Sequence, residues 1–210
     1  MSTSTETHDA AWYDAAYAEY PPYAQSPIKH MYEKVAGLIP RSAPVCDIGC
    51  GSGYLASALQ EINYTGDYVG LDFSPVAIEM ARACFQNRQL SLPYFENFNV
   101  NRYQFYTEDL RDWEPGVSDA THKTVFVCLE VLEHVESDTD IIALLPARSR
   151  FIFSVPNYWS RSHVRTYDSV GVAFIKFSTL LKFNACYILP TKQPEAAIYI
   201  YDTIRRGDKW

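Results

Sequence analysis

The sequence predicts an α/β fold built on an open, mainly parallel sheet, and three observations lead to this prediction. A short apolar run at residues 45–48 is followed by glycines at positions 49, 51 and 53 and then by a helix-forming stretch. Beyond it, apolar runs of strand length alternate with helical patterns, which is the order of strand–helix–strand units. Near the C-terminus, two apolar runs are joined by a short turn with two prolines, which predicts an antiparallel hairpin.

The part of the chain before the first strand is predicted to be mostly helical. Residues 1–11 are polar and are expected to form a disordered tail, so that one folded domain covers residues 12–210. Residues 11–20 form a helix with an aromatic stripe, and Pro21 ends it. Residues 27–39 form a second helix, because their apolar side chains recur at helical spacing.

The middle of the chain begins with a strand that ends at Asp72. Ser74 and Pro75 then start a helix that runs to about Phe85, because serine is a favoured N-cap and proline a favoured first helical residue. Residues 87–103 have no clean periodicity and predict a long insertion before the third strand. The remaining predicted elements are a strand at 124–129, a helix at 138–145, a strand at 150–157, a helix at 168–183, and strands at 185–189 and 197–203.

The glycine loop is the most informative motif. Its glycines allow left-handed turns and allow a ligand to lie directly against the backbone. The helix that follows presents unpaired backbone N–H groups and a partial positive charge to this turn. Asp47 stands at the strand end, where a carboxylate would repel a pyrophosphate but suits a positively charged ligand. The Asp-x-Gly-x-Gly-x-Gly spacing also differs from the Gly-x-Gly-x-x-Gly of dinucleotide binders, which disfavours a nucleotide-binding oxidoreductase.

The loop and the motifs after it resemble class I S-adenosylmethionine-dependent methyltransferases. Asp72 ends the second strand 25 residues after Asp47, Asp109 follows the third strand, and a Leu-Glu-His run follows the fourth. The resemblance covers roughly residues 12–205. It implies a Rossmann-like, seven-stranded sheet in the order 3-2-1-4-5-7-6, with an antiparallel last strand and a helical N-terminal cap.

The resemblance also implies S-adenosylmethionine as the cofactor. Asp47 would hold the loop and the methionine ammonium group, and Asp72 would bind the ribose hydroxyls, with Phe73 against the adenine. The alternative for Asp47 is a turn-capping role without ligand contact. The adenine edge would be read by Asp109, or by Glu108 or Asp112 after a small shift of register. The implied cofactor-binding residues are Asp47, Gly49, Cys50, Gly51, Gly53, Asp72, Phe73, Asp109, Leu110 and Glu130.

Glu133, His134 and His163 are the candidate catalytic residues. A sulfonium methyl group is already activated, so its transfer needs positioning and, for a hydroxyl acceptor, removal of a proton. His134 lies four residues after Glu130, in an expected helical turn, and an unperturbed imidazole titrates near neutrality. The alternative is that Glu133 and His134 only cap the following helix. Candidate acceptor-binding residues are Tyr23, in the N-terminal cap, and Arg165, beyond the fifth strand; the latter alternatively lies in a solvated loop.

Three functions are compatible with these motifs. The favoured one is methylation of an oxygen or nitrogen of a small metabolite, sugar or natural product. The second is metal-dependent RNA 2′-O-methylation, because Glu130, Glu133 and His134 match a metal-ligand pattern of that family. His163 is the candidate for its later histidine but comes sooner than in that pattern. The third is a protein that binds S-adenosylmethionine without catalysis.

Composition favours the first function. The chain carries a net charge of −7 with a pI near 5.2, so it lacks the basic footprint of nucleic-acid-binding proteins. We therefore predict no nucleic-acid partner. We also predict no metal, because the Leu-Glu-His motif without a metal is far commoner in the superfamily that the chain resembles. The sequence has neither a signal-peptide pattern nor an apolar run of membrane-spanning length, and its five cysteines include no Cys-x-x-Cys pair. These features predict a cytoplasmic protein with reduced thiols and no membrane association.

Overall fold

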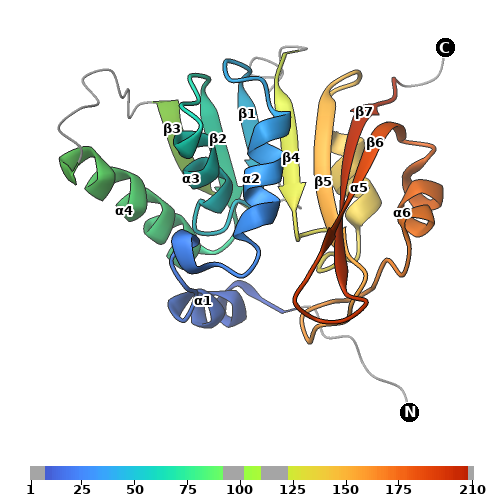
Figure 1. The fold of residues 1–210 in the computed structure, drawn as a ribbon, viewed down its shortest axis with the longest axis horizontal. Helices are drawn as coiled ribbons and strands as arrows, with labels where there is room; N and C mark the ends of the chain where they lie inside the picture. Colours follow the sequence, from blue (N-terminus) through green and yellow to red (C-terminus); the bar gives the residue numbers. More distant parts are fainter. Residues whose placement is uncertain (1–7, 92–101, 110–122, 208–210) are drawn as a thin grey trace. The chain divides into compact units, whose positions relative to one another are not determined.

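The computed structural model describes residues 8–91, 102–109 and 123–207 (Figure 1). Its strand order over these residues is β3-β2-β1-β4-β5-β7-β6, which confirms the order predicted from the sequence. Contacts divide the chain into two compact units, residues 9–113 and residues 114–210 together with 1–8. Each unit is described separately below.

The 9–113 unit contains three parallel strands, β1 (Val45–Ile48), β2 (Tyr68–Asp72) and β3 (Tyr103–Thr107). Its helices are α1 (Ala10–Ala18), the short 3-10 helix η1 (Tyr23–Gln25), α2 (Lys29–Leu38), α3 (Tyr54–Glu61) and α4 (Pro75–Ser91). Because β1, β2 and β3 are parallel, their carboxyl ends meet at one edge, as in other α/β sheets that bind ligands there. The glycine loop and Asp72 therefore lie next to each other.

Aromatic side chains form much of the core of this unit. Tyr68 is fully buried in β2, and its ring lies 5.6 Å from that of Phe105 in β3. Phe85 of α4 stacks on Tyr103 at 4.8 Å between ring centroids. Burying rings of this size stabilises the unit through the hydrophobic effect and fixes α4 on the sheet.

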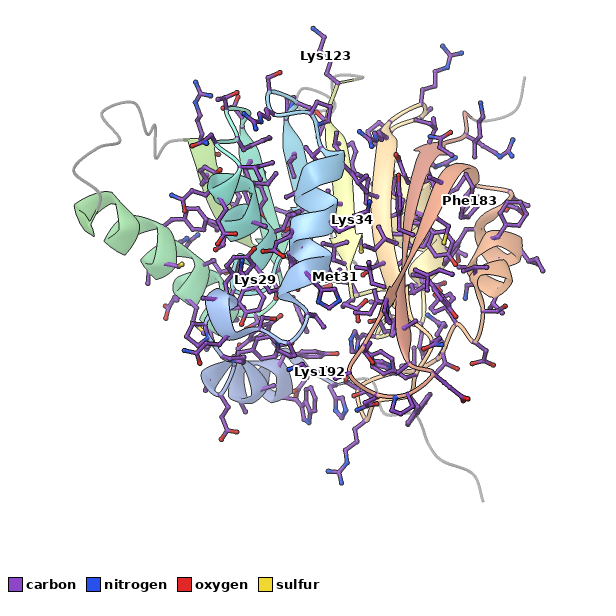
Figure 2. All side chains as sticks on the ribbon, viewed as in Figure 1. Lys29, Met31, Lys34, Lys123, Phe183 and Lys192 are labelled. Atoms are coloured by element: carbon purple, nitrogen blue, oxygen red, sulfur yellow. The ribbon has the colours of Figure 1, made fainter. Side chains whose placement is uncertain are left out.

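The 114–210 unit contains β4 (Val125–Leu129), α5 (Asp138–Leu144), β5 (Arg150–Pro156), α6 (Val170–Phe177), β6 (Leu181–Pro190) and β7 (Ala197–Arg205). Strand β4 is parallel to β5, whereas β7 runs antiparallel to both β5 and β6. Arg150 of β5 donates two hydrogen bonds to Asp202 of β7, at 2.9 and 2.7 Å. Phe183, labelled in Figure 2, packs between β6 and α6, with its ring 4.9 Å from that of Phe174. The predicted C-terminal hairpin is thus present.

The predicted helix at residues 168–183 is wrong over its second half. Helix α6 ends at Phe177, and β6 begins at Leu181. Residues 181–190 pair with β7 over nearly their whole length, and after the buried Leu181 their side chains alternate between exposed and half-buried positions. Pairing with β7 outweighed the local helical preference of this apolar run, because strand formation depends strongly on tertiary context.

The other boundaries differ by smaller amounts. Asp9 caps α1 by accepting a hydrogen bond from the Trp12 backbone N–H at 3.0 Å, so residues 10 and 11 of the predicted tail are helical. Helix α4 continues to Ser91, so the first residues of the predicted insertion belong to this helix. The rest of that insertion, over residues 92–101, lies outside the described residues. Among the described helices, none has both the length and the apolar character needed to cross a bilayer.

Candidate functional site

The glycine loop has the backbone conformation that its sequence predicts. Gly49, Gly51 and Gly53 have φ angles of 72°, 52° and 81°, all in the left-handed region that residues with a Cβ atom rarely adopt. Gly53 is also the N-cap residue of α3. The start of α3 therefore directs its backbone N–H groups towards the loop at the end of β1.

Asp72 holds this loop in place. Its Oδ2 accepts a hydrogen bond from the Gly51 backbone N–H at 2.8 Å, and its Oδ1 accepts one from the Ser74 backbone N–H at 2.9 Å. The side chain is 4% exposed, and burial raises the pKa of its carboxyl group while the two N–H donors lower it. Asp72 thus ties the end of β2 to the glycine loop, and each carboxylate oxygen keeps a further lone pair for a ligand.

Asp47 is buried at the end of β1. Its Oδ2 accepts a hydrogen bond from the Tyr68 hydroxyl at 2.5 Å. Burial raises its pKa to about 7, although the Tyr68 hydrogen bond opposes the shift, and the nearby charge of Asp72 raises it further. A positively charged ligand close to Asp47 would compensate for this buried negative charge.

Helix α1 lies against the glycine loop. A Cβ atom placed on Gly51 would be 2.8 Å from the Tyr17 hydroxyl oxygen. Asp14 of the same helix accepts a hydrogen bond from the Ser74 hydroxyl, and the Tyr13 ring lies 5.1 Å from that of Phe73. The aromatic stripe at residues 12–20 was the sequence signal for this contact, but Tyr17 was not among the predicted site residues.

The structure also gives the positions of other predicted site residues of this unit. Cys50 is buried and packs against β2. A Cβ atom placed on Gly70 of β2 would be only 2.8 Å from the Cys50 sulfur. Asp109 follows β3 within the described residues, whereas Leu110 lies outside them. Tyr23 is buried beside Tyr54, and its hydroxyl donates to Glu61 at 3.4 Å. Its contact with an acceptor stays a prediction.

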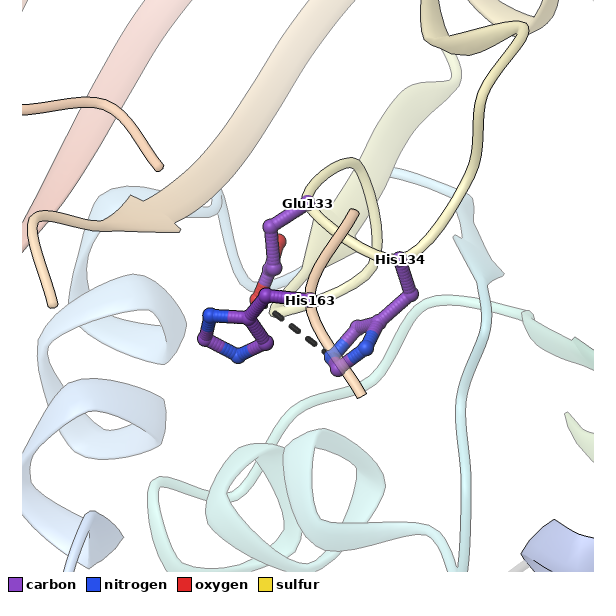
Figure 3. A group of neighbouring side chains, drawn as sticks. All are labelled: Glu133, His134 and His163. Carbon is purple, nitrogen blue, oxygen red and sulfur yellow. Dashed lines mark ion pairs between the residues drawn. The ribbon is translucent and has the colours of Figure 1, made fainter. Parts of the chain in front are cut away.

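Glu133, His134 and His163 form one cluster in the 114–210 unit, shown in Figure 3. One potential ligand atom from each residue lies within 4.8 Å of the others. His134 Nε2 is 3.6 Å from Glu133 Oε1, and the two imidazole rings pack edge to face at 4.8 Å. The three predicted catalytic residues are therefore neighbours, although His163 is distant from the other two in sequence.

The turn after β4 and the loop after β5 hold this cluster together. The Val164 backbone N–H donates to the Glu133 carbonyl at 2.8 Å, and the His134 N–H closes a turn onto Val131 at 2.9 Å. Helix α5 starts only at Asp138. The predicted helical turn that would join Glu130 to His134 is therefore a non-helical turn in the structure.

Both imidazoles are oriented by backbone carbonyl groups. His134 Nδ1 lies 2.8 Å from the Ser162 carbonyl oxygen, and His163 Nδ1 lies 3.1 Å from that of Tyr158. A carbonyl oxygen only accepts, so each Nδ1 carries the proton and each neutral ring has its lone pair on Nε2. Burial lowers the pKa of His134 to about 4 and also lowers that of His163. The near-neutral pKa expected for His134 from the sequence is therefore wrong.

Glu133 and Glu130 have different surroundings. Glu133 is 0% exposed, and neither of its carboxylate oxygens has a hydrogen-bond partner among the described residues. Burial and the charge of Glu130 raise its pKa well above the usual range. Glu130 instead accepts a hydrogen bond from the Ser154 hydroxyl at 2.8 Å, and its own backbone has a φ of 55°. Its contact with the cofactor stays a prediction.

Arg165 forms hydrogen bonds with the backbone next to the Glu133, His134 and His163 cluster. Its guanidinium donates to the backbone carbonyl groups of Leu132, Val135 and Glu136 and, at 3.0 Å, to the Asp138 carboxylate. Asp138 is buried and also accepts a hydrogen bond from the Tyr167 hydroxyl at 2.8 Å. Arg165 thus fixes the turn that carries Glu133 and His134. Its contact with an acceptor stays a prediction.

Replacing Arg165 with alanine should lower the free energy of unfolding by about 2–4 kcal/mol, because several backbone acceptors and the buried Asp138 lose their donor. For a chain of this size, the melting temperature should fall by about 5–10 °C. Thermal and urea unfolding measure both quantities. Arg161→Ala, at an exposed position, is the matched control and should change stability by less than about 0.5 kcal/mol. Equal stability of the two variants would contradict the assignment.

Together, the strand order, the antiparallel β7 and the glycine loop at the end of β1 define a class I methyltransferase fold. A family model described as a methyltransferase domain matches residues 20–172, and the chain belongs to this family. A curated relative, a ubiquinone biosynthesis O-methyltransferase of Xanthomonas campestris, is 30% identical over 131 residues, which are 62% of this chain and 48% of the relative. The chain therefore spans about half the length of this relative.

Solved structures share the fold. Magnesium protoporphyrin IX methyltransferase from Synechocystis PCC 6803, crystallised with S-adenosylmethionine, is 21% identical and has a TM-score of 0.60 over 86% of this chain and 80% of that one. N-methyltransferase NodS from Bradyrhizobium japonicum, crystallised with S-adenosylhomocysteine, is 14% identical and has a TM-score of 0.65 over 96% of this chain and 100% of that one. At these identities, the comparison establishes the fold.

Proposed function

We propose that this protein is an S-adenosylmethionine-dependent methyltransferase that methylates an oxygen or nitrogen atom of a small metabolite, sugar or natural product. The observation that carries the proposal is the loop at the end of β1, where three glycines have left-handed backbone conformations and the Gly51 N–H group donates to Asp72. Membership of the methyltransferase domain family supports the same activity. We also propose a cytoplasmic location, because the five cysteines are scattered along the sequence and include no Cys-x-x-Cys pair.

The proposed cofactor site uses the two buried carboxylates of the 9–113 unit. Asp72 has lone pairs left for the ribose hydroxyls after accepting from Gly51 and Ser74. Asp47 supplies negative charge for the methionine ammonium group, and helix α1 covers the loop through Tyr17. Phe73 and Asp109 are assigned to the adenine in this proposal.

The proposed acceptor site uses Glu133, His134 and His163. A hydroxyl acceptor loses its proton as its oxygen attacks the sulfonium methyl group, and S-adenosylhomocysteine leaves. The cluster offers imidazole lone pairs and a carboxylate without a hydrogen-bond partner among the described residues. Arg165 acts as a positioning residue that holds this cluster.

The proposal is tested first by calorimetry with S-adenosylmethionine, S-adenosylhomocysteine and a nicotinamide dinucleotide. We expect micromolar binding of the first two, about 8 kcal/mol, and none of the third. Incubation with methyl-labelled cofactor and panels of phenols, hydroxy acids, sugars and amines then identifies the acceptor. Tight binding without transfer to any panel would favour a non-catalytic binding protein, and absence of cofactor binding would overturn the proposal.

Cofactor binding should release a proton from Asp47 near neutral pH. Its pKa is about 7 without ligand, and a cationic ligand favours the ionised carboxylate, so affinity should fall towards low pH by up to about tenfold per unit below pH 7. Titrations at pH 6–8.5 in buffers of different ionisation enthalpy measure the affinity and the released proton. In the Asp47→Asn variant, the ligand itself titrates as before, but there is no carboxyl proton at position 47 to release. An identical pH dependence in the two proteins would rule out Asp47 as the group.

A further inference from the structure

We infer that helix α6 is the contact surface of a symmetric homodimer, in which it packs antiparallel against α6 of a second copy of the chain. The inference concerns the association of the protein and does not depend on the proposed methyl transfer. Three features of the 114–210 unit carry it: the apolar outer face of α6, the continuation of this face on β6, and the opposite charges at the two ends of the helix.

The exposed side chains of α6 are all apolar. Val172, Phe174 and Ile175 are 40%, 52% and 75% exposed. The charged residue of the helix, Lys176, is engaged within the unit, because its Nζ lies 2.8 Å from the buried carboxylate of Asp138. A helix at a protein surface normally carries polar side chains on its outer face, whereas a helix that is apolar on all sides is covered. The outer face of α6 therefore has the composition of a buried surface.

The opposite side of α6 is fixed on the sheet. Phe177 is fully buried, and its ring meets that of Phe153 of β5 edge to face at 5.6 Å. The Tyr201 hydroxyl of β7 donates to the Val170 carbonyl at 2.9 Å. Because these contacts fix the orientation of the helix, α6 cannot turn its apolar outer face towards the core. The exposure of this face is a property of the folded unit.

The apolar surface continues from α6 onto β6, which is the edge strand beside it (Figure 1). The Phe174 ring lies 4.9 Å from that of Phe183 of β6. Phe183 and Ile188 pair with Thr203 and Tyr199 of β7, which are four residues apart, so both lie on the face of the sheet that α6 covers. Ile188 is itself exposed. A contiguous exposed apolar surface of this kind marks a site of interaction.

The two ends of α6 carry opposite charges. Asp168 is exposed and lies just before the N-cap residue Ser169. The exposed Arg206 lies at the other end of the helix, where its backbone N–H and its Nε donate to the carbonyl groups of Leu180 and Leu181 at 2.8 and 3.1 Å. The surface therefore begins with an acid, has an apolar centre and ends with a base.

This order of groups selects a second copy of the chain as the partner. When two such helices pack antiparallel about a two-fold axis, Asp168 of each copy faces Arg206 of the partner subunit, and Ile175 lies near the centre of both. The two helix dipoles are then antiparallel as well. An anionic lipid surface, in contrast, repels a chain with a net charge of −7. A homodimer thus satisfies the apolar and the charged groups of this surface together.

The test is sedimentation velocity of the full chain at concentrations from about 1 to 200 µM. Helix α6 is only about 12 Å long, so the interface is at the small end of specific interfaces, and we expect a dissociation constant of about 1–50 µM. At the highest concentration, the main species should have twice the 24.0 kDa mass of one chain.

Ile175→Asp places a charge at the centre of the interface and should weaken dimerisation by at least about 100-fold. Because Ile175 is exposed, the melting temperature of the dilute monomer should change little. Tyr106→Asp is the matched control, since Tyr106 is an exposed apolar residue of β3 in the other unit. This variant should dimerise like the wild type.

Two charge reversals test the symmetry of the contact. Asp168→Arg and Arg206→Asp each place like charges opposite each other in a homodimer, and each should weaken it by about tenfold or more. A mixture of the two variants should associate within about threefold of the wild-type affinity, because a mixed dimer pairs opposite charges at both ends. Only a contact between two copies of α6 predicts this recovery.

Several outcomes would overturn the inference. They are a chain that stays monomeric at the highest concentration, undiminished dimerisation of Ile175→Asp, or failure of the two folded charge variants to associate with each other. A monomeric chain that binds phosphatidylcholine vesicles through Ile175 would mean that the surface contacts lipid instead. Because sedimentation is measured without S-adenosylmethionine, its result and that of the cofactor titration are independent of each other.

Discussion

Replacing His134 with alanine is expected to lower turnover by about 10²–10⁴-fold while the affinity for S-adenosylmethionine changes less than about twofold. His134 belongs to the cluster assigned to the acceptor, and the change removes the imidazole lone pair that faces Glu133. Loss of a general base reduces the rate of the chemical step. The glycine loop, to which we assign the cofactor, lies in the other unit and retains its own contacts.

The alternative is a structural role, since His134 Nδ1 also binds the Ser162 carbonyl. The His134→Asn variant separates the two roles, because its amide can still donate to this carbonyl but carries no imidazole. A catalytic role predicts that the asparagine variant melts close to the wild type yet stays as inactive as the alanine variant. Initial rates with saturating cofactor and thermal unfolding measure this. Full turnover in either folded variant would refute the catalytic role.

Replacing Asp72 with alanine should weaken S-adenosylmethionine binding by about 10²-fold or more. The variant loses the acceptors that we propose for the ribose hydroxyls, and each charge-assisted hydrogen bond contributes about 1.5–3 kcal/mol. It also releases Gly51 and Ser74, whose N–H groups donate to the carboxylate at 2.8 and 2.9 Å. Both effects act in the same direction, and calorimetry measures their sum.

Asp67→Ala is the matched control, because Asp67 is an exposed carboxylate of the same unit just before β2. It should bind the cofactor like the wild type. Circular dichroism and melting experiments show whether the Asp72 variant is folded when its affinity is measured. Unchanged affinity in a folded Asp72→Ala protein would mean that the ribose lies elsewhere and that Asp72 serves only the loop.

The glycine loop and most of the strand ends could be predicted from the sequence because their causes are local. A positive φ requires glycine at positions such as 51 and 53, and a short apolar run before them has few alternatives to a buried strand. The positions of Asp47 and Asp72 near the ends of β1 and β2 could be predicted in the same way, because each follows a short apolar run. Residues 181–183 were wrongly predicted as helix because β6 depends on its pairing with β7, and no local pattern contains that pairing.

The partners of the functional side chains came only from the tertiary structure. His163 meets Glu133 because the loop after β5 is hydrogen-bonded to the turn after β4, a contact between segments about 30 residues apart. Arg165 lies where its guanidinium group donates to three backbone carbonyl groups and to Asp138, which no spacing in the sequence indicates. Burial then lowered the pKa of His134 to about 4 and raised that of Asp47 to about 7. Residue type sets which protons and lone pairs a side chain has, but desolvation and distant partners decide which of them are available.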